Sequence, residues 1–323
     1  MDFLQEKGMD IIMAKVWTMG ELLCEVMRPD TDMTLYEPGV FMGPYPSGAP
    51  GIFIDTVARL GHSGGIIGGV GKDDFGKCIM DRLASDGVDC SLITEYEEGT
   101  TGVAFVTYFE DGSRKFLYHF PNTPATWSKA PKAKELGEDI QYFHVMGCSL
   151  MACPSFASEI LKLVGELATK GVKFSFDPNI RPELMRDESV LSMIQEVMKH
   201  THLLLPGVSE LLQISGQPTI QEAIGKCFEN PKLEVIALKR GAQGVTVYTR
   251  TQEIIQEAYP VHVIDPTGAG DCFDGAFVCG MIEERPLQEV AAMATAAGAL
   301  NTMALGPMEG DITPETIRKM IKE

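Results

Sequence analysis

The chain has 323 residues, of which 45% are hydrophobic and 22% are charged, values that are ordinary for a globular protein. Its 45 acidic and 27 basic residues give a formal net charge of −18, which repels nucleic acid and anionic lipid. No apolar run reaches the roughly 18 residues of a membrane span, and the eight cysteines lack zinc-site spacing. We therefore expect a cytoplasmic protein with free thiols and with neither a nucleic-acid nor a membrane partner.

The first third of the chain predicts a β-rich region around a few helical segments. Residues 15–23 (KVWTMGELL) read as one first strand, and the preceding residues 1–13 read as a poorly ordered leader. Residues from about 24–46 and 100–120 have extended patterns, and the second stretch contains two β runs around an Asp111-Gly112 turn. These two stretches predict a small β lid on a single α/β domain that covers residues 14–323.

From residue 141 onward, strand and helix patterns alternate. The apolar strands are expected to form a mainly parallel sheet with helices on both faces, and ligands bind such sheets beyond the carboxyl ends of the strands. The expected strands cover residues 64–70, 141–147, 172–177, 201–206, 233–239 and 244–249, and the expected helices cover 51–61, 74–87, 154–171, 190–199, 208–215 and 219–228.

Residues 265–277 read DPTGAGDCFDGAF, a small-residue turn that leads into an apolar helical pattern. The free N–H groups at a helix N-terminus can bind an anion, and the small residues Gly268, Ala269 and Gly270 let a ligand approach the backbone closely. The acid Asp271 follows at once. The pattern alone leaves open whether it caps the helix or performs chemistry.

This turn resembles the C-terminal signature of the ribokinase-like (PfkB-type) carbohydrate kinases, nearest the branch of ketohexose and 2-keto-3-deoxygluconate kinases. Further similar stretches follow in family order from about residue 19 to residue 306. The resemblance implies a three-layer α/β/α fold with a mainly parallel central sheet and a small β lid. The similar stretches are ARLG at 58–61, GGVGKDDFG at 68–76, DPNIR at 177–181 and LKRGAQG at 238–244.

The resemblance also implies roles in phosphoryl transfer from ATP to a sugar hydroxyl. Asp271 would be the general base, and the amides of Gly268, Ala269 and Gly270 would hold the transferred phosphoryl group. Arg181 and Asn179 would face the phosphates, and their alternatives are a surface salt bridge and a turn asparagine. Because a helix N-terminus favours negative charge by ~0.5 kcal/mol, we expect Asp271 to be ionised.

Nucleotide and metal contacts are implied in the same way. Glu210 would organise Mg²⁺ through water, although Gly207 stands where the family has an asparagine. Asp265 and Thr267, with carbonyls of the loop 301–306, would match a site for a monovalent cation such as K⁺. The residues implied near the nucleotide are Lys239, whose alternative is an ordinary solvated lysine, and Gly241, Gly244, Gly268, Gly270 and Asn301.

The substrate is less well defined by the resemblance. Ile52 replaces the asparagine that usually contacts a sugar hydroxyl, so Asp55, one helical turn later, is a candidate substitute. No arginine follows the aromatic strand of the lid (FLYHFPNTPA), which favours a neutral sugar over a sugar acid. The residues expected to bind the substrate are Glu25, whose alternative is an ordinary lid glutamate, and Gly48, Asp55, Tyr118, Asn179 and Asp271.

Our leading hypothesis is an ATP- and Mg²⁺-dependent kinase for the primary hydroxyl of a ketohexose such as fructose or tagatose. The alternatives are a 2-keto-3-deoxygluconate kinase, a nucleoside kinase and a catalytically silent sugar-binding relative. A dinucleotide-dependent oxidoreductase, suggested by GGIIGGVG at 64–71, is disfavoured because these glycines follow a later strand. Lid edges can pair between subunits, so we expect a homodimer.

Overall fold

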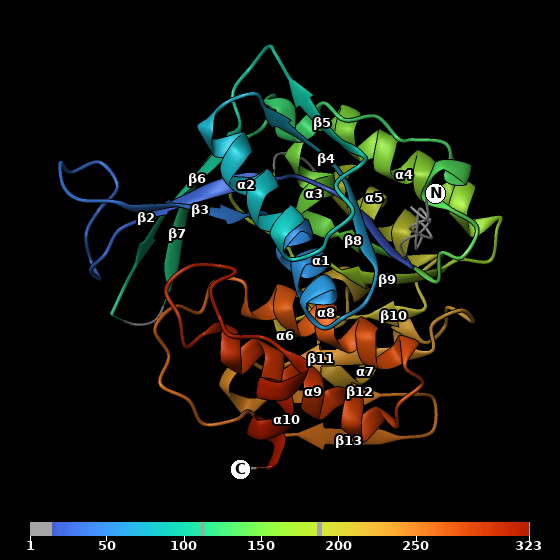
Figure 1. Ribbon diagram of the computed structural model, residues 1–323. Coiled ribbons are helices and arrows are strands. Elements are labelled where there is room, and N and C mark those ends of the chain that lie inside the picture. Colours follow the sequence, from blue (N-terminus) through green and yellow to red (C-terminus); the bar gives the residue numbers. More distant parts are fainter. Residues whose placement is uncertain (1–14, 111–112, 186–188, 323) are drawn as a thin grey trace, which may run out of the picture.

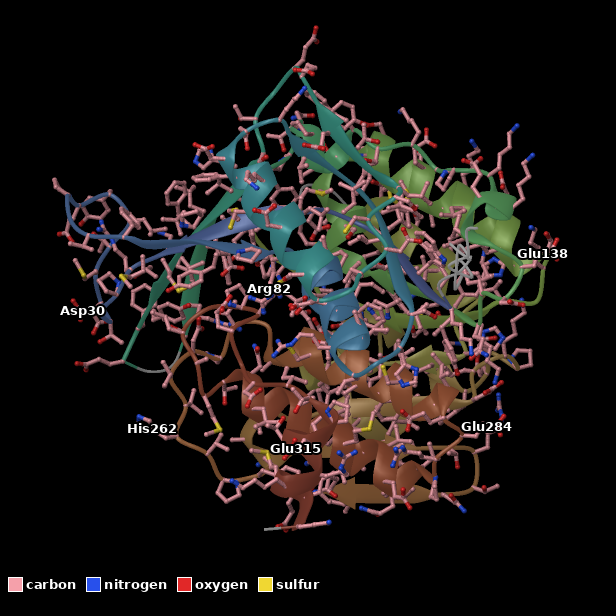
Figure 2. The ribbon with its side chains drawn as sticks, in the orientation of Figure 1. Asp30, Arg82, Glu138, His262, Glu284 and Glu315 are labelled. Carbon is pink, nitrogen blue, oxygen red and sulfur yellow. The ribbon has the colours of Figure 1, made fainter. Side chains whose placement is uncertain are left out.

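The structure is a computed structural model that describes residues 15–110, 113–185 and 189–322. The expected leader and the Asp111-Gly112 turn lie outside these residues. Within the described ranges, no helix is both long and apolar enough to span a membrane. Acidic side chains such as Asp30, Glu138, Glu284 and Glu315 project from different sides of the molecule, in keeping with its negative charge (Figure 2).

A nine-stranded sheet forms the centre of the protein (Figure 1). Its neighbouring strands run parallel, except for the antiparallel pairs β11–β12 and β12–β13 at one edge. The expected mainly parallel sheet is therefore confirmed. Its order is β13 (Glu253–Gln256), β12 (Val245–Tyr248), β11 (Val235–Lys239), β10 (Leu203–Leu204), β9 (Lys173–Asp177), β8 (Tyr142–Met146), β1 (Val16–Met19), β4 (Gly64–Gly71) and β5 (Ile93–Tyr96).

Helices cover both faces of this sheet and make three layers. Alternate residues of a strand enter different cores, as Phe143 and Val145 do on one face and Tyr142 and Met146 on the other. One core is covered by α3 (Gly147–Ala152), α4 (Pro154–Ala168), α5 (Ser189–Met198), α6 (Val208–Ser215) and α7 (Ile220–Cys227). The other is covered by α1 (Ala49–Arg59), α2 (Asp74–Ser85), α8 (Ala269–Ile282), α9 (Leu287–Asn301) and α10 (Pro314–Lys322).

A separate four-stranded sheet is built from the two stretches expected to form the lid (Figure 1). The pair β2–β6 is parallel, and β2–β3 and β6–β7 are antiparallel. This sheet confirms the expected β lid. Its order is β3 (Met42–Ser47), β2 (Leu23–Met27), β6 (Gly102–Tyr108) and β7 (Arg114–His119).

The single first strand expected over residues 15–23 is wrong. The chain leaves the large sheet after Met19 and enters the lid at Leu23. At the bend, a Cβ on Gly20 would lie only 2.1 Å from Cγ of Pro50, so the start of α1 packs directly against the backbone there. Local apolar patterning could not reveal this close approach.

Candidate active site

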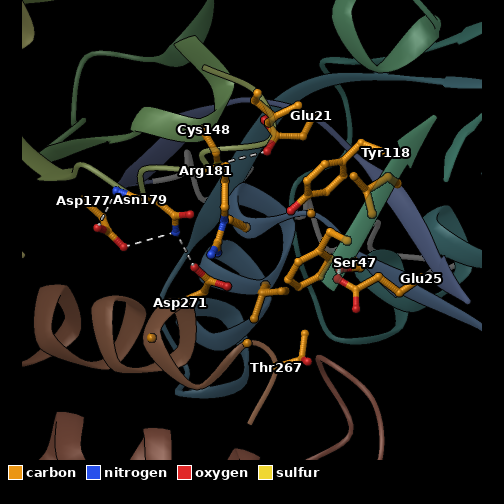
Figure 3. Close-up of a pocket in the computed structure, with 18 of the residues that line it drawn as sticks. Glu21, Glu25, Ser47, Tyr118, Cys148, Asp177, Asn179, Arg181, Thr267 and Asp271 are labelled. Carbon is orange, nitrogen blue, oxygen red and sulfur yellow. Dashed lines mark hydrogen bonds between the residues drawn. The ribbon is translucent and has the colours of Figure 1, made fainter. Parts of the chain in front are cut away.

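A pocket of about 190 Å³ opens between the lid and the carboxyl ends of the central strands (Figure 3). Its lining combines side chains from both sheets with the first turn of α8. The lid and its base contribute Glu25, Ser47, Gly48, Arg114, Phe116 and Tyr118, whereas the core contributes Asp177, Asn179, Arg181, Glu210, Lys239, Thr267, Gly268, Gly270 and Asp271. The pocket therefore brings together most of the site residues that the sequence suggested.

The N-terminal turn of α8 places Asp271 in this pocket. Gly268 is the N-cap and has a left-handed backbone (φ 78°), and a Cβ on it would lie 2.3 Å from the Pro307 carbonyl oxygen. Asp271 is 6% exposed, and Asn179 donates from Nδ2 to its Oδ1 over 3.2 Å. Asn179 is itself left-handed (φ 37°) and is held by Asp177 Oδ1, which accepts its backbone N–H over 3.0 Å.

The protonation of Asp271 differs from our expectation. Burial raises its pKa to about 7, although the nearby guanidinium of Arg181 opposes the rise. A helix N-terminus stabilises the charge by about 0.5–1 kcal/mol, which is less than one pKa unit. Desolvation is the larger effect, so the expectation of an ionised Asp271 is wrong below about pH 7, where the raised pKa favours the protonated carboxyl.

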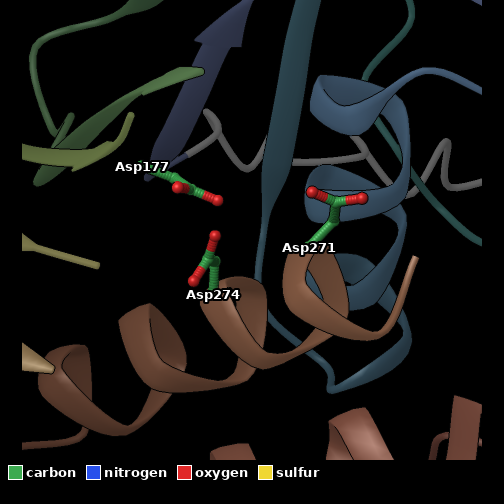
Figure 4. A group of neighbouring side chains, drawn as sticks. All are labelled: Asp177, Asp271 and Asp274. Carbon is green, nitrogen blue, oxygen red and sulfur yellow. The ribbon is translucent and has the colours of Figure 1, made fainter. Parts of the chain in front are cut away.

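Lys239 lies in a cage of carboxylates beside Asp271. Its Nζ lies 2.8 Å from Oδ2 of Asp177 and 3.0 Å from Oδ1 of Asp274, so the alternative of a solvated lysine is wrong. Asp177, Asp271 and Asp274 each place one oxygen within 4.8 Å of the others (Figure 4). The sequence analysis missed Asp274, although an acid inside an otherwise apolar helix is a signal for a buried partner.

Two arginines line the pocket near the ring of Phe116. The guanidinium carbon of Arg181 lies 5.9 Å from the ring centroid, and that of Arg114 lies 5.8 Å from it. Among the described residues, no carboxylate oxygen comes within 4.0 Å of either guanidinium, which removes the salt-bridge alternative for Arg181. Arg114 was missed, but the alternation of β7 places it on the same face as Phe116 and Tyr118.

Glu25 lies on the lid side of the pocket and is 5% exposed. Its Oε1 accepts a hydrogen bond from Oγ of Ser47 over 2.6 Å, whereas its buried Oε2 has no partner among the described residues. Burial raises the pKa of Glu25 to about 7. Gly48 and Tyr118, both expected to bind the substrate, line the same region.

A second buried acid, Glu21, was not singled out from the sequence. Its carboxylate accepts hydrogen bonds from Oγ of Ser149 and from Sγ of Cys148, the latter over 3.1 Å. Figure 3 shows the contact between Cys148 and Glu21 at the upper edge of the pocket. The available signal was that GELLCE contains two acids, Glu21 and Glu25. The structure places both of them in one pocket.

Asp55 does not line the pocket, so the prediction that it replaces the missing asparagine is wrong. It lies one turn further along α1 than Ile52, where the helix faces α2 instead of the cavity. Its Oδ2 lies 3.7 Å from Arg59 Nη1 and 3.8 Å from Arg82 Nη2. Ile52 does line the pocket and leaves an apolar surface there.

The remaining nucleotide candidates lie behind or beside the turn. Asn301 is fully buried and donates from Nδ2 to the carbonyls of Thr267 and Pro307, so it supports the turn and does not line the pocket. Gly241 begins a short 3₁₀ segment, Gly241–Gln243, and Gly244 follows it, and both glycines lie outside the pocket lining. Their role in nucleotide binding stays a prediction.

The candidate metal ligands Glu210 and Asp265 already accept hydrogen bonds from other groups of the protein. Glu210 lines the pocket and accepts the backbone N–H groups of Ile180 and Gly207 over 2.8 and 2.7 Å, one on each oxygen. Asp265 is fully buried, and its carboxylate accepts three hydrogen bonds. These come from the backbone N–H of Thr267, the hydroxyl of Tyr108 and the backbone N–H of Gly306.

Known proteins of similar sequence identify the family of this chain. Residues 44–314 match the model of the pfkB family of carbohydrate kinases. The chain is 28% identical to a fructokinase of Escherichia coli over 310 residues, which cover 91% of this chain and 95% of that one. It is 26% identical to probable fructokinase-5 of Arabidopsis thaliana, over 94% of this chain and 96% of that protein.

A solved structure agrees with this assignment. An Escherichia coli protein provisionally named ribokinase II, in complex with ATP and Mg²⁺, superposes with a TM-score of 0.90 and 36% identity. The match covers 96% of this chain and 99% of that one. The chain belongs to the pfkB family of carbohydrate kinases and is a sugar kinase.

Proposed function

We propose that this kinase uses ATP to phosphorylate a primary hydroxyl of a ketohexose such as fructose, with Asp271 as the general base. The observation that carries the proposal is the buried Asp271 carboxyl beside the N-terminal turn of α8, inside a pocket covered by the lid. Fructokinases that match over nine-tenths or more of this chain support the choice of a ketohexose.

The chemistry follows from the contacts of Asp271. Asn179 occupies its Oδ1, which leaves Oδ2 to accept the proton of the sugar hydroxyl while the hydroxyl oxygen attacks the γ-phosphorus. The N–H groups of the turn at Gly268 and Gly270 and the guanidinium of Arg181 would stabilise the charge on the moving phosphoryl group. A pKa of about 7 suits a base that must accept a proton near neutral pH.

The sugar would lie against the lid. The unpartnered Oε2 of Glu25 can accept a hydrogen bond from a sugar hydroxyl, which would end its unsatisfied burial. Ile52 supplies an apolar wall where other family members use an asparagine. Glu21 and Glu25 would repel a carboxylate, so a neutral ketohexose fits this surface better than 2-keto-3-deoxygluconate, the runner-up substrate.

Mg²⁺ and ATP would lie on the core side. Glu210 fits a water-mediated role, because its carboxylate lines the pocket and keeps lone pairs beyond the two that accept backbone N–H groups. The ion would offset the repulsion between the phosphates and the nearby carboxylates. K⁺ would use main-chain carbonyls near Thr267 together with the lone pair that the Asp265 carboxylate keeps beyond its three hydrogen bonds.

A coupled assay of ADP release tests the proposal directly. The purified full chain is supplied with ATP and Mg²⁺ and then with fructose, tagatose, 2-keto-3-deoxygluconate or adenosine. We expect turnover to be fastest with a ketohexose, and product analysis should show a phosphate on a primary carbon. Faster turnover with the sugar acid or the nucleoside would replace the ketohexose, and turnover with none of them would contradict the proposal.

A further inference from the structure

Arg114 is a cation of the lid that forms no ion pair with a carboxylate in the described ranges, and its guanidinium carbon lies 5.8 Å from the ring centroid of Phe116. Three other arginines of the described ranges, Arg59, Arg82 and Arg285, contact acidic groups, and Arg240 contacts the hydroxyl of Thr246. Arg28 instead donates to main-chain carbonyls. Arg114 contacts neither an acidic group nor a main-chain carbonyl in the described ranges, where its polar partner is the neutral hydroxyl of Thr267, 3.2 Å from its Nη1. Such a guanidinium keeps most of its donors available to a ligand.

The lid holds this guanidinium at the catalytic turn. Arg114 on β7 pairs across the sheet with Tyr108 on β6. The hydroxyl of Tyr108 contacts Asp265 Oδ1 over 3.0 Å and Thr267 Oγ1 over 3.2 Å. Both members of the cross-strand pair therefore touch the segment that immediately precedes Gly268, the N-cap of α8.

A second guanidinium of the pocket, that of Arg181, lies near the same aromatic ring. Arg181 and Arg114 lie at nearly equal distances from the ring of Phe116, at 5.9 and 5.8 Å. Burial raises the pKa values of Asp271 and Glu25, whereas the charges of both arginines act on these carboxyls and lower the pKa values, so a bound anion in the same pocket would also be stabilised by both. Both line the same pocket as Gly268, Gly270 and Asp271.

We propose that Arg114 is a further catalytic residue, which binds the phosphoryl group during its transfer together with Arg181 and the turn amides. The inference rests on the proposed function and adds a lid-borne ligand to its phosphate site. Guanidinium groups suit this task because their planar donors match phosphate oxygens. The lid would thus supply charge stabilisation in addition to covering the sugar.

A carboxylate of a sugar acid is the competing source of negative charge. Two observations favour the phosphoryl group. Arg114 touches Thr267, which leads into the turn at Gly268, and the surface next to the expected sugar carries the acids Glu21 and Glu25. A substrate carboxylate would be repelled by those acids, whereas the phosphoryl group would lie at the turn.

Replacement of Arg114 by Met keeps most of its length and removes its charge. We expect kcat with fructose to fall about 100-fold or more, as when one donor to transition-state charge is lost, while the KM for fructose stays within about threefold. Arg114→Lys should retain an intermediate rate. Lys115→Met is the matched control, because Lys115 is the exposed neighbour on the other face of β7.

Binding of inorganic phosphate gives a readout that does not need turnover. Phosphate should raise the Tm of the wild type and of Asp271→Asn, and Arg114→Met should lose about half of that shift or more. If Asp271→Asn stayed active, the proposed base would be wrong, but the phosphate titration would still test Arg114.

Three results would overturn the inference. The first is a kcat of Arg114→Met within about threefold of the wild type. The second is an unchanged response of its Tm to phosphate. The third is an increase in KM confined to 2-keto-3-deoxygluconate with kcat preserved, which would assign Arg114 to a substrate carboxylate instead.

Discussion

Two clusters of charged side chains in this protein contain the same residue types but differ in the partners of their arginines. Beside α1 and α2, Arg82 places Nε 2.6 Å from Oδ2 of Asp86 and Nη1 2.9 Å from Oε1 of Glu309 (Arg82 is labelled in Figure 2). In the pocket, Arg114 and Arg181 have no carboxylate within 4.0 Å in the described ranges. The first cluster joins elements of the fold, whereas the second is open to a ligand.

The largest expected effect separates catalysis from stability. Asp271→Asn keeps the shape of the side chain but removes the base, so kcat should fall about 10³-fold or more. The Tm should be unchanged or higher, because burial already disfavours the charge of this carboxyl. Steady-state kinetics and thermal unfolding check both parts, with the exposed Asp81→Asn as control. Turnover within about tenfold of the wild type would remove Asp271 from the role of base.

The buried cation of the pocket should matter most for stability. Lys239→Met leaves Asp177 and Asp274 buried without their ammonium partner, and the free energy of unfolding should fall by about 3 kcal/mol. Adding Asp274→Asn should restore part of that loss, because one uncompensated charge disappears. Urea denaturation measures both variants. If the free energy of unfolding fell no further than in Lys115→Met, the burial of Asp177 and Asp274 would not depend on the ammonium group of Lys239.

The two raised pKa values predict the pH dependence. Asp271 and Glu25 both have a pKa of about 7 because they are buried, so kcat/KM with fructose should fall about tenfold or more per pH unit below pH 7. Glu25→Gln should make this fall less steep. Since the folded pKa values exceed the ordinary ones, ionisation costs stability, and the Tm should decline as the pH rises through about 7. A flat rate profile from pH 5 to 8 would argue against a carboxyl base of this pKa.

The sugar contact should change affinity more than rate. Glu25→Gln weakens a charge-assisted hydrogen bond, so the KM for fructose should rise about tenfold while kcat stays within about threefold. The exposed Glu95→Gln on β5 serves as control. An unchanged KM would place the sugar away from the lid acid.

The smallest effect is expected in the closed cluster. Arg82→Met removes contacts to Asp86 and Glu309 at a site that is 20% exposed, and the free energy of unfolding should fall by about 1–2 kcal/mol. The kcat/KM should stay within about twofold of the wild type. A large loss of activity in a stably folded variant would mean that the two clusters are coupled.

Between about residues 51 and 249 the sequence predicted the strands and helices apart from β5 and α3, and it also predicted the small-residue turn with Asp271, because periodicity and turn chemistry are local properties. It did not predict β13, α9 and α10. It failed where distant segments decide. The bend at Gly20 depends on Pro50, and the direction of Asp55 depends on Arg82 of another helix. The raised pKa of Asp271 depends on desolvation by the whole pocket, which no local pattern reports.

Other site residues were missed for the same reason. Asp274 has its partner in Lys239, which comes from the distant strand β11, and Arg114 precedes the aromatic residues of β7, whereas the expected lid arginine would follow them. The place of Glu21 in the site depends on the bend after β1, which brings Glu21 and Glu25 into one pocket. Alternation along a strand predicts which side chains share a face, but it does not predict which residues of other elements that face contacts.

The pocket is assembled from two parts of the chain with different tasks. The wall next to the expected sugar comes from residues before 150, whereas the proposed base Asp271, the amide of Asn179 and the ammonium of Lys239 come from residues after 176. Substrate preference could therefore drift through changes in the first half while the transfer chemistry of the second half stays intact. The cross-strand pair of Tyr108 and Arg114 is the exception, since any exchange of the first half must still supply a hydroxyl and a guanidinium to Thr267.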